Sequence, residues 1–511
     1  MLFTLNTPHG TTAMASSQVS GAGLCPQDPL PVVIIGNGPS GICLSYLLSG
    51  HRPYLKEKVS HPNPILHQKV QEIAGEPLLE QNLEYLSEGL EGRSLSPLSL
   101  LLDALLRPEG DLGGTAESLL TWRRDPGQHL AHLVLGKGPI GGAWQAMEGS
   151  MVTLSLGEWM ELPDLSFRDW MMRRGRQLRN NRATTRDVAQ YYQHYVQAKS
   201  LQQNFCSGML VTSVRLLWRD ETGAWNTVTE WGMGAADPSG MLFEVQGVED
   251  VQGSRQRPFR VFARTVVLAT GTYDCPARLG VEGEDLPNVF HTIGDLERKL
   301  QARQLGPDSD PLLVVGAGLT AADAVLLAQR SGVPIVHAFR RAVHDSTLVF
   351  NQLPALMFPE YHKVHDMMAC QPLTSSGPYR GYTSLPCHRV LCFHPSGKIT
   401  LEDCGGKGSK RERRIFDISM AIVLIGSNPD LSFLPDGGRG LALNPCQPVS
   451  AKRNPLDTDP FSYESTRQPG LYALGPLAGD GFVRFLQGGA LGVTSSLMKK
   501  HCQHKSQRVT L

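Results

Sequence analysis

The chain lacks an excess of charge of either sign. Its 511 residues include 48 Lys and Arg and 48 Asp and Glu, so the formal net charge is zero. A balanced chain has no global field that would draw it to nucleic acid or to an anionic membrane, so we expect neither partner. Residues 407–414 (KGSKRERR) form the one dense basic run, which is typical of a solvated surface hairpin or loop, with a partner-binding patch as the alternative.

Paired cysteines, long apolar runs and a leader are also missing. The ten cysteines stand singly, without a C-x-x-C motif or His at zinc-ligand spacing. This pattern indicates a reducing compartment and argues against a C-x-x-C oxidoreductase and a structural zinc site, so we expect no metal. No uncharged apolar run reaches the roughly 18 residues of a membrane span. Residues 1–30 contain no Lys or Arg, so no signal or transit peptide is visible, and we interpret them as a disordered tail on a cytoplasmic protein.

The sequence does contain a glycine-rich turn near its start. In VVIIGNGPSG, β-branched apolar residues precede three glycines, and an apolar helical pattern follows. The first Gly of such a turn permits its tightness, the second lets the backbone approach a pyrophosphate, and the third allows close packing. The helix start then offers free N–H groups to phosphates. This pattern predicts a dinucleotide-binding site at Gly36, Gly38, Pro39, Ser40 and Gly41.

A second turn of the same kind lies within PLLVVGAGLTAADA. Gly316, Gly318 and Ala321 hold the three positions, and Ala at the third still allows close packing. The following strand ends in Arg340 and Arg341, where a cofactor ribose would be bound. Two arginines suit a 2′-phosphate, so this turn favours NADPH over NADH. The alternative is a pair of arginines at a solvated strand end.

The segments between these turns differ in character. Residues 51–132 mix prolines, a polar helical pattern and a Leu-rich amphipathic stretch, so we predict a mostly helical insertion between the first helix and the second strand. A capped helix is expected to start at Thr185 or Asp187. Together the segments predict an α/β fold with two nested Rossmann-like dinucleotide-binding domains, the second set inside the sequence of the first.

The order of short motifs resembles the flavin-dependent monooxygenases that use FAD and NADPH. GNGPSG is followed by GGAW, then by VVLATGTYDCPA, then by GAGLTA, and a late GLYALGPLAGD resembles the loop that approaches the flavin. The resemblance implies FAD on the first turn and NADPH on the second. It adds Gly141, Gly142, Trp144, Thr270, Gly271, Gly475 and Asp480 to the cofactor-binding residues. A core Trp and an ordinary loop Asp are the alternatives for Trp144 and Asp480.

The implied domains follow from this resemblance. An FAD-binding domain covers 31–275 and returns at 426–500, an NADPH-binding domain covers 276–425, and a tail covers 501–511.

A closer resemblance is to the oxidative stress-induced growth inhibitor family. It rests on many separate strings, among them YLSEGLEGRS, MEGSM, HAFRRAV, FNQLP, PEYHKVH, SAKRNP and GPLAGDGFVRFLQGGAL. The resemblance implies a role in growth, differentiation, cell death and cytokinesis. It also implies a cytoplasmic location that includes the midbody.

The chain departs from the flavin monooxygenase pattern in three places. The second strand ends in Gly136 and Lys137 where an acidic residue would bind the FAD ribose, so Glu57 or Glu148 takes that role or FAD is held less tightly. The linker signature keeps His291 but has Asp and Pro where Phe and Gly would stand, and the late A-T-G-Y-type string is LIGSNPD. These departures argue against the classical xenobiotic-oxidising members.

The functional prediction is an NADPH-dependent FAD monooxygenase that transfers one oxygen atom from O2 to a nucleophilic substrate, a protein side chain included. No catalytic base is assigned, and His291 is the best candidate, with a structural role as its alternative. The competing hypothesis is a retired flavoprotein fold that binds growth-regulatory or cytoskeletal proteins through the insertion. A third is an NADPH oxidase that releases hydrogen peroxide.

Overall fold

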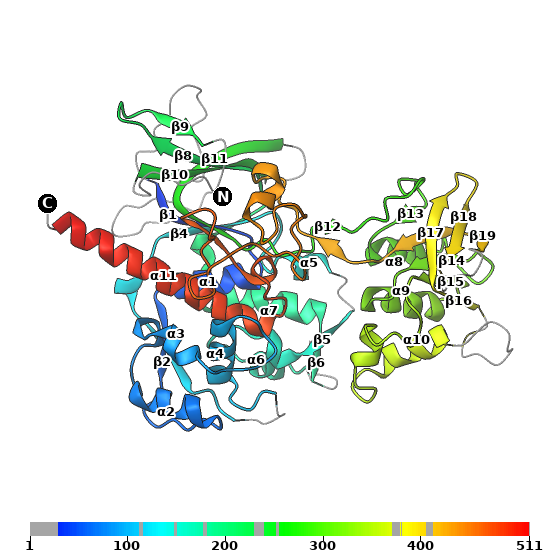
Figure 1. The fold of residues 1–511 in the computed structure, drawn as a ribbon. Helices are drawn as coiled ribbons and strands as arrows, with labels where there is room; N and C mark the ends of the chain where they lie inside the picture. The colour runs from blue at the N-terminus through cyan, green and yellow to red at the C-terminus, as the bar shows by residue number, and fades with distance from the viewer. Residues whose placement is uncertain are drawn as a thin grey trace.

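The chain folds into two lobes, each built around its own β-sheet (Figure 1). The computed structural model describes residues 29–111, 116–147, 151–176, 181–228, 240–251, 255–369, 379, 381–404 and 412–509. The α/β fold with two nested Rossmann-like units is therefore confirmed, because each lobe contains a set of parallel strands with flanking helices.

The first lobe contains a sheet with the strand order β7-β4-β1-β11-β10-β8-β9, and β22 also pairs with β11. β1, β4, β7, β22 and the last residues of β11 run parallel, whereas β10, β8 and β9 extend the sheet antiparallel. The bounds are β1 (Leu30–Ile35), β4 (His132–Gly136), β7 (Phe205–Ser207), β8 (Met209–Arg219), β9 (Trp225–Thr227), β10 (Met241–Val251), β11 (Arg255–Leu268) and β22 (Leu471–Ala473).

The run of β-branched residues in β1 is buried on both faces, as expected for a central parallel strand. Val32 and Ile34 belong to one hydrophobic core, and Val33 and Ile35 belong to another on the opposite face. The first core is covered by α1 (Pro39–Leu48), α7 (Thr185–Ala198) and α11 (Val483–Val509). α7 begins at a capping box, in which Thr184 and Asp187 satisfy each other's backbone N–H groups.

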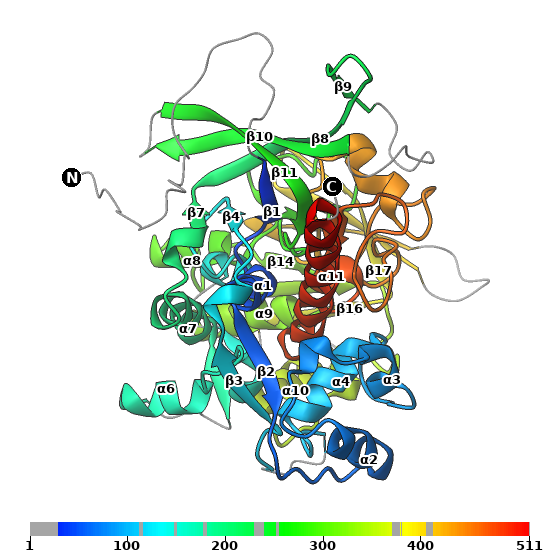
Figure 2. The same ribbon diagram turned by 90° about the vertical axis from the view of Figure 1, so that its left-hand side faces the viewer.

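The insertion lies below the first sheet and packs against α11 (Figure 2). It contains α2 (Pro64–Glu72), α3 (Leu83–Ser87) and α4 (Pro97–Leu106), so its helical character agrees with the sequence pattern. The pattern missed one feature: β2 (His51–Leu55) and β3 (Leu120–Arg124) pair antiparallel at its base. Strands this far apart in sequence carry no local hairpin signal, because no tight turn joins them.

Between β4 and β7 the described residues form α5 (Ala143–Ala146), α6 (Phe167–Arg173), α7 and a pair of short strands, which complete the first lobe. α5 follows the GGAW string, and α6 packs beside α7 through Phe167 and Trp170. β5 (Val152–Leu156) and β6 (Arg182–Thr184) pair antiparallel on the side that faces the second lobe.

The second lobe has an entirely parallel sheet with the order β13-β20-β14-β15-β16. Its helices cover one face and a small antiparallel sheet covers the other, each over its own hydrophobic core. The bounds are β13 (Val289–Phe290), α8 (Ile293–Gln301), β14 (Leu312–Val315), α9 (Leu319–Arg330), β15 (Ile335–Phe339), α10 (Pro359–Ala369), β16 (Tyr382–Pro386), β17 (His388–Phe393), β18 (Lys398–Asp403), β19 (Arg413–Asp417) and β20 (Met420–Val423).

The chain passes between the lobes twice, and the two crossings pair with each other. β12 (Cys275–Pro276) leads into the second lobe, and β21 (Ser427–Asn428) leads out of it. A buried arginine adds a side-chain link, because Arg182 on β6 donates to a carboxylate oxygen of Glu360 on α10 at 2.6 Å.

The two predicted tails have different outcomes. Residues 1–28, most of the predicted disordered tail, lie outside the described residues. Residues 407–411 of the basic run lie outside them as well. α11 continues to Val509, so residues 501–509 are helical where a tail was predicted. No Gly or Pro follows Lys500 to stop the helix, and Gln, Lys and Arg favour its continuation.

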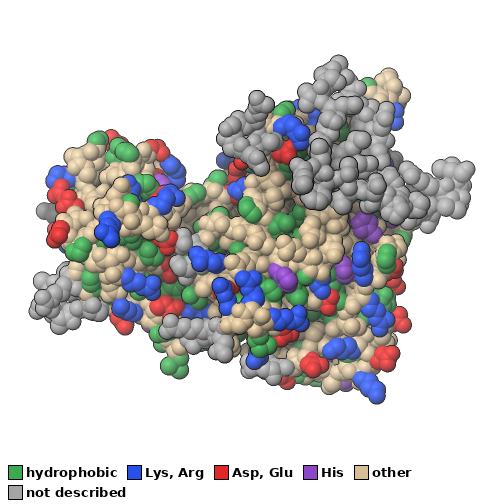
Figure 3. All heavy atoms as spheres, turned by 180° about the vertical axis from the view of Figure 1, so that it is seen from behind, with side chains coloured by type: hydrophobic (Ala, Val, Ile, Leu, Met, Phe, Trp, Pro, Cys, Tyr) green, Lys and Arg blue, Asp and Glu red, His purple; other side chains and the backbone are tan. Residues whose placement is uncertain are grey.

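The described surface mixes basic and acidic side chains, as Figure 3 shows for the face seen from behind. None of the helices in the described part of the chain is both long enough and apolar enough to cross a membrane.

Candidate functional site

The first glycine turn joins β1 to α1 with almost no free space. Gly36 has φ +118°, and a Cβ added there would lie 2.2 Å from the carbonyl oxygen of Ala269. A Cβ added at Gly41 would lie 2.1 Å from the carbonyl oxygen of Gly36. Only glycine fits either position, because backbone atoms cannot give way as a flexible side chain would.

Three other predicted segments meet this turn. Gly142 has φ +59°, and a Cβ there would lie 2.8 Å from the Cα of Gly38. On another side, the Gly475 loop abuts the first turn of α1, since a Cβ at Gly475 would lie 2.5 Å from Ser40 Oγ. The Thr270 backbone nitrogen would lie 2.9 Å from a Cβ at Gly36. The fold thus brings together residues that the sequence spreads over more than 400 positions.

The start of α1 is left without a side-chain cap. Gly38 is its N-cap, no side chain accepts a hydrogen bond from its first turn, and that turn carries no acidic residue. Other helices of the first lobe begin differently, with an Asn, Ser or Thr oxygen that accepts from a first-turn N–H: α2, α3, α4, α6 and α7. The bare N–H groups and the positive end of the helix dipole make the α1 start suited to a phosphate.

A cavity of about 90 Å³ lies beside this turn. Its lining includes Gly36, Gly142 and Thr270 together with residues of β8 and of the loop after β21. The Thr270 hydroxyl is buried and has no hydrogen-bond partner among the described residues. A buried hydroxyl without a partner costs free energy, so a ligand oxygen at this position would satisfy it. This observation fits a dinucleotide better than an ordinary structural turn.

The expected acidic residue at the end of β4 has a structural replacement. Asn37 occupies the space beside Gly136: a Cβ at Gly136 would lie 2.0 Å from Asn37 Nδ2, and that nitrogen donates to the Gly138 carbonyl at 2.8 Å. The next residue, Lys137, pairs with Asp274 at the rim of the cavity.

Neither of the two glutamates proposed to bind the FAD ribose is seen at the cavity among the described residues. Glu57 lies beside Gly75 in the insertion, with its Cγ 3.8 Å from where a Gly75 Cβ would stand. Glu148 is outside the described residues.

Trp144 and Asp480 make contacts with protein rather than standing free. The Trp144 ring lies edge-on to Tyr192, with 6.3 Å between ring centroids, at the border of a hydrophobic core. The Asp480 carboxylate accepts hydrogen bonds from Tyr463 at 2.9 Å and from Ser94 and Ser99 at 3.2 Å each. Burial raises the pKa of Asp480 to about 6, although the three hydroxyl donors oppose the shift. We call Ser94, Ser99 and Tyr463 the Asp480 cage. The sequence analysis did not predict this cage, because its residues are far apart along the chain.

The second turn repeats the geometry of the first with more room. Gly316 has φ +131°, and a Cβ there would lie 2.2 Å from the carbonyl oxygen of Leu424 but 3.7 Å from the Cβ of Ala321. Gly318 is the N-cap of α9, again without a side-chain cap, and a Cβ there would meet no atom within 4 Å. The approach to the α9 start is therefore open.

Arg340 and Arg341 follow β15 and are exposed beside this turn. The Gly316 N–H donates to the carbonyl of Ala338, two residues before Arg340. Arg341 donates from Nη1 to the Thr347 carbonyl at 2.8 Å. The strand end thus carries two positive charges close to the predicted pyrophosphate position, as a 2′-phosphate site requires.

Two histidines in the second lobe, the buried His337 and the half-buried His291, have structural partners. The ring of His337 on β15 lies 2.6 Å from the Gly316 carbonyl oxygen through Nε2 and 2.6 Å from Tyr382 OH through Nδ1. Burial lowers the pKa of His337 to about 4. His291 Nε2 lies 3.0 Å from a carboxylate oxygen of Glu284, which also accepts from two backbone N–H groups. These contacts favour the structural alternative for His291.

Comparison with known proteins gives the family. No family model matches the chain. Oxidative stress-induced growth inhibitor 1 from Homo sapiens is 53% identical over 487 residues, which cover 95% of this chain and 99% of that protein. The chain belongs to the oxidative stress-induced growth inhibitor family. Oxidative stress-induced growth inhibitor 2 from Homo sapiens is 47% identical over 92% of this chain and 94% of its own, and the Caenorhabditis elegans homologue is 27% identical over 91% and 93%.

Solved structures show the fold of this growth inhibitor family member. Bacillithiol disulfide reductase from Bacillus cereus superposes with a TM-score of 0.54, at 16% identity, over 93% of this chain and all of that one. L-lysine 6-monooxygenase from Pseudomonas syringae gives 0.52, at 14% identity, over 92% and 99%. The chain therefore has the Rossmann-type fold of FAD- and NAD(P)-binding flavoproteins.

Proposed function

We propose that the protein is an FAD-containing, NADPH-dependent monooxygenase that transfers one oxygen atom from O2 to a nucleophilic substrate. The observation that carries the proposal is the buried Thr270 hydroxyl without a partner, which borders the cavity at the bare start of α1. The solved structures with this fold include a lysine monooxygenase and a cadaverine monooxygenase bound to FAD, and their names favour this reaction class.

The residues present fit the two cofactors. Gly36, Gly38 and Gly41 would let the backbone approach a pyrophosphate, and the first-turn N–H groups of α1 would donate to it. Gly316 and Gly318 would do the same at α9, where Arg340 would supply charge for a 2′-phosphate. When bound, the flavin would supply the redox chemistry with oxygen, which the chain's own residues cannot provide.

The protein's part is to bind, orient and exclude water. Asn37 fixes the loop after β4 by its bond to Gly138, so the GGAW segment is held against Gly38. Arg182 joins the two lobes through Glu360 and stacks on Phe358 at 4.5 Å, which limits their relative movement. A fixed distance between the two turns suits two cofactors that must react with each other.

The test is a visible absorption spectrum of purified full-length protein before and after anaerobic NADPH. We expect the bands of oxidised flavin, their bleaching by NADPH, and their return with oxygen. A colourless protein that cannot be reconstituted with FAD would overturn the proposal. Bleached flavin that reoxidises with full release of hydrogen peroxide, over a panel of thiol, thioether and amine nucleophiles, would instead indicate an NADPH oxidase.

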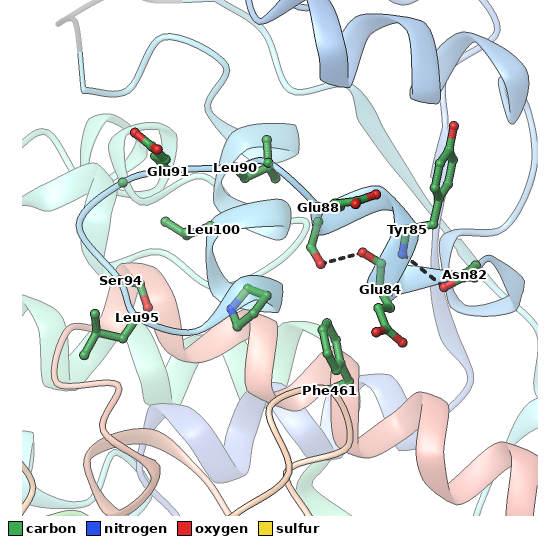
Figure 4. Close-up of a pocket in the computed structure, with 14 residues that line it drawn as sticks. Asn82, Glu84, Tyr85, Glu88, Leu90, Glu91, Ser94, Leu95, Leu100 and Phe461 are labelled. Carbon is green, nitrogen blue, oxygen red and sulfur yellow. Dashed lines mark hydrogen bonds between the residues drawn. The ribbon is translucent and has the colours of Figure 1, made fainter.

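A second function, partner binding, is favoured by a groove on the insertion (Figure 4). The groove has a volume of about 870 Å³ and is lined by acidic side chains, Glu84, Glu88 and Glu91, and by apolar ones such as Leu90 and Phe461. The relatives' names state growth inhibition, which a protein contact at this groove would serve.

This groove can be tested without deleting the insertion, since α4 packs on α11 and deletion would expose the core. Leu95 is fully exposed at the groove, so Leu95→Glu is expected to leave flavin content unchanged. Loss of growth inhibition in cells with flavin retained would support partner binding. Unchanged growth inhibition by Leu95→Glu, combined with its loss in Gly38→Leu protein, would refute it.

A further inference from the structure

Two cysteines of the second lobe lie opposite each other at the open end of a hairpin. β17 and β18 pair with His388 opposite Asp403, and Cys387 directly precedes the first of these residues while Cys404 directly follows the second. The Cys404 N–H donates to the Cys387 carbonyl at 2.6 Å, so the backbones of the two cysteines are adjacent. Both cysteines are free thiols, with Cys404 exposed and Cys387 half-buried.

This placement meets the geometric requirement for a disulfide. The single backbone hydrogen bond of 2.6 Å keeps the Cα atoms of Cys387 and Cys404 within about 6.5 Å of each other, because it adds only the N–Cα bond and the Cα-to-oxygen span of one carbonyl. Disulfides join Cα atoms about 4.4–6.8 Å apart. Of the other exposed cysteines, Cys275 pairs with Asn428 across β12 and β21, and Cys446 lies in no strand.

We propose that Cys387 and Cys404 are a reversible redox modification site, which closes to a disulfide when the protein meets a peroxide. The sulfur of Cys404 attacks the peroxide, so an S–O bond forms, the O–O bond breaks, and an alcohol or water leaves. The sulfur of Cys387 then attacks that of Cys404, the S–S bond forms, and water leaves. Two thiols lose two electrons and the peroxide gains them, while a dithiol reductant restores both thiols.

The order of the two cysteines follows from their surroundings. Cys404 is exposed and can meet a peroxide from solvent. Burial raises the pKa of Cys387, and the neighbouring Asp403 and Cys404 add to the rise. A thiol kept protonated is the poorer first nucleophile, so Cys387 acts second.

The site lies at the edge that carries the predicted 2′-phosphate arginines. The Cys387 N–H donates to the Arg341 carbonyl at 3.3 Å, and the preceding residue, Pro386, pairs with Phe339 at the end of β15. A disulfide between Cys387 and Cys404 would therefore restrain the backbone at Cys387, which is hydrogen-bonded to Arg341. We expect NADPH affinity to differ several-fold between the oxidised and reduced protein, a consequence that rests on the proposed function.

The experiment treats full-length protein with one equivalent of hydrogen peroxide under non-reducing conditions, followed by trypsin and mass spectrometry. Cleavage after Arg389 and Lys398 separates Cys387, Cys392 and Cys404 into different peptides, so any link is assigned directly. We expect a peptide pair that joins Cys387 to Cys404, the loss of two titratable thiols, and full recovery with dithiothreitol.

Matched variants decide the assignment. Cys404→Ser and Cys387→Ser are each expected to abolish the linked pair, whereas Cys446→Ser, an exposed cysteine elsewhere, keeps it. A wild-type protein that forms no such pair, or that links Cys404 to another cysteine, overturns the proposal. This readout needs no cofactor, so it stands apart from the proposed function.

NADPH titration of the same samples tests the coupling. Oxidised wild type should differ several-fold from reduced wild type, while peroxide-treated Cys404→Ser should match its untreated form. Equal affinities with the link formed would overturn the coupling and leave the modification site. Absence of NADPH binding in both redox states would count against the proposed function alone.

Discussion

The two glycine turns share a design but differ in how tightly they are enclosed. In each turn, the first glycine lies against the carbonyl of the residue that follows the neighbouring strand of the sheet. A Cβ added at Gly36 would lie 2.2 Å from the Ala269 oxygen, and a Cβ added at Gly316 would lie 2.2 Å from the Leu424 oxygen. They differ at the third position, where an added Cβ at Gly41 would lie 2.1 Å from the Gly36 carbonyl oxygen, whereas the second turn already holds Ala321. Gly142 and the Gly475 loop also border the first turn, while the second glycine is open in both: an added Cβ at Gly38 meets only the Gly142 Cα at 4.0 Å, and one at Gly318 meets nothing within 4 Å. A crowded turn favours a permanently held cofactor, and an open one favours a ligand that exchanges.

The third position should show the largest difference between the turns. Gly41→Ala places a Cβ 2.1 Å from the Gly36 carbonyl oxygen, whereas the second turn already has Ala321. We expect Gly41→Ala to lower the free energy of unfolding of the first lobe by about 3 kcal/mol or more. Thermal unfolding measures it, with Ala321→Gly as the control, which should cost about 1 kcal/mol or less. Equal costs for both variants would contradict the comparison.

Asp480 lies on the loop that follows Gly475 beside the first turn, and its burial predicts that the free energy of unfolding depends on pH. Its pKa is raised from 3.8 to about 6, so the folded protein binds more protons than the unfolded chain across that range. The free energy of unfolding should therefore fall as pH rises from about 4 to about 6, by about 3 kcal/mol at 1.36 kcal/mol per pKa unit.

Denaturant unfolding between pH 4 and 7 tests this effect. Asp480→Asn removes the titrating group, so its pH profile should lack that fall, whereas exposed Asp308→Asn should keep it. A profile of Asp480→Asn parallel to the wild type would show that the cage does not act in this way.

The second glycine of each turn should separate the two cofactors. A Cβ at Gly38 meets only the Gly142 Cα at 4.0 Å, so a larger side chain can fold there but would occupy the pyrophosphate approach. Gly38→Leu is expected to weaken flavin binding at least about a hundredfold, or about 2.7 kcal/mol. Gly318→Leu should spare the flavin and weaken NADPH. Flavin absorbance and NADPH titration give both readouts, and flavin retained at full occupancy in Gly38→Leu would exclude the first turn as its site.

The smallest expected effect concerns the arginines of the open turn. Replacing Arg340 and Arg341 by Ala removes charge-assisted contacts to a 2′-phosphate, and we expect KM for NADPH to rise about tenfold, or 1.4 kcal/mol. KM for NADH should stay nearly unchanged. Because Arg341 also holds the Thr347 carbonyl, Arg340→Ala alone is the matched variant without that structural loss. Equal changes for both nucleotides would contradict the 2′-phosphate assignment.

Local patterns in the sequence predicted the parts of the fold that local physics determines. The strand–turn–helix units at Gly36 and Gly316 were evident because glycine spacing, β-branched runs and helical periodicity all lie within about 30 residues. The nested order of the segments gave the fold class. The capped helix was found for the same reason, and α7 starts at Thr185, one of the two predicted starts, with Thr184 as its N-cap.

Features that depend on distant residues had no such signal. The sequence could not show that Asn37 fills the place of the missing acidic residue, or that Ser94, Ser99 and Tyr463 surround Asp480. The β2–β3 pair and the Cys387–Cys404 pair likewise depend on strand register. The cofactor assignments themselves stay predictions until a flavin spectrum is measured.

The pairing of β22 with β11 has a consequence for how the chain is made. β22 and α11 complete the first sheet and cover its core, yet they leave the ribosome only after the whole second lobe. The residues from β13 to β20 are contiguous and contain a whole parallel sheet. The second lobe is therefore able to fold during synthesis, while the earlier part of the chain keeps apolar surface exposed until β22 and α11 follow. A chain truncated after β21 would present a finished second lobe on an unfinished first one, and such chains are natural clients for chaperones.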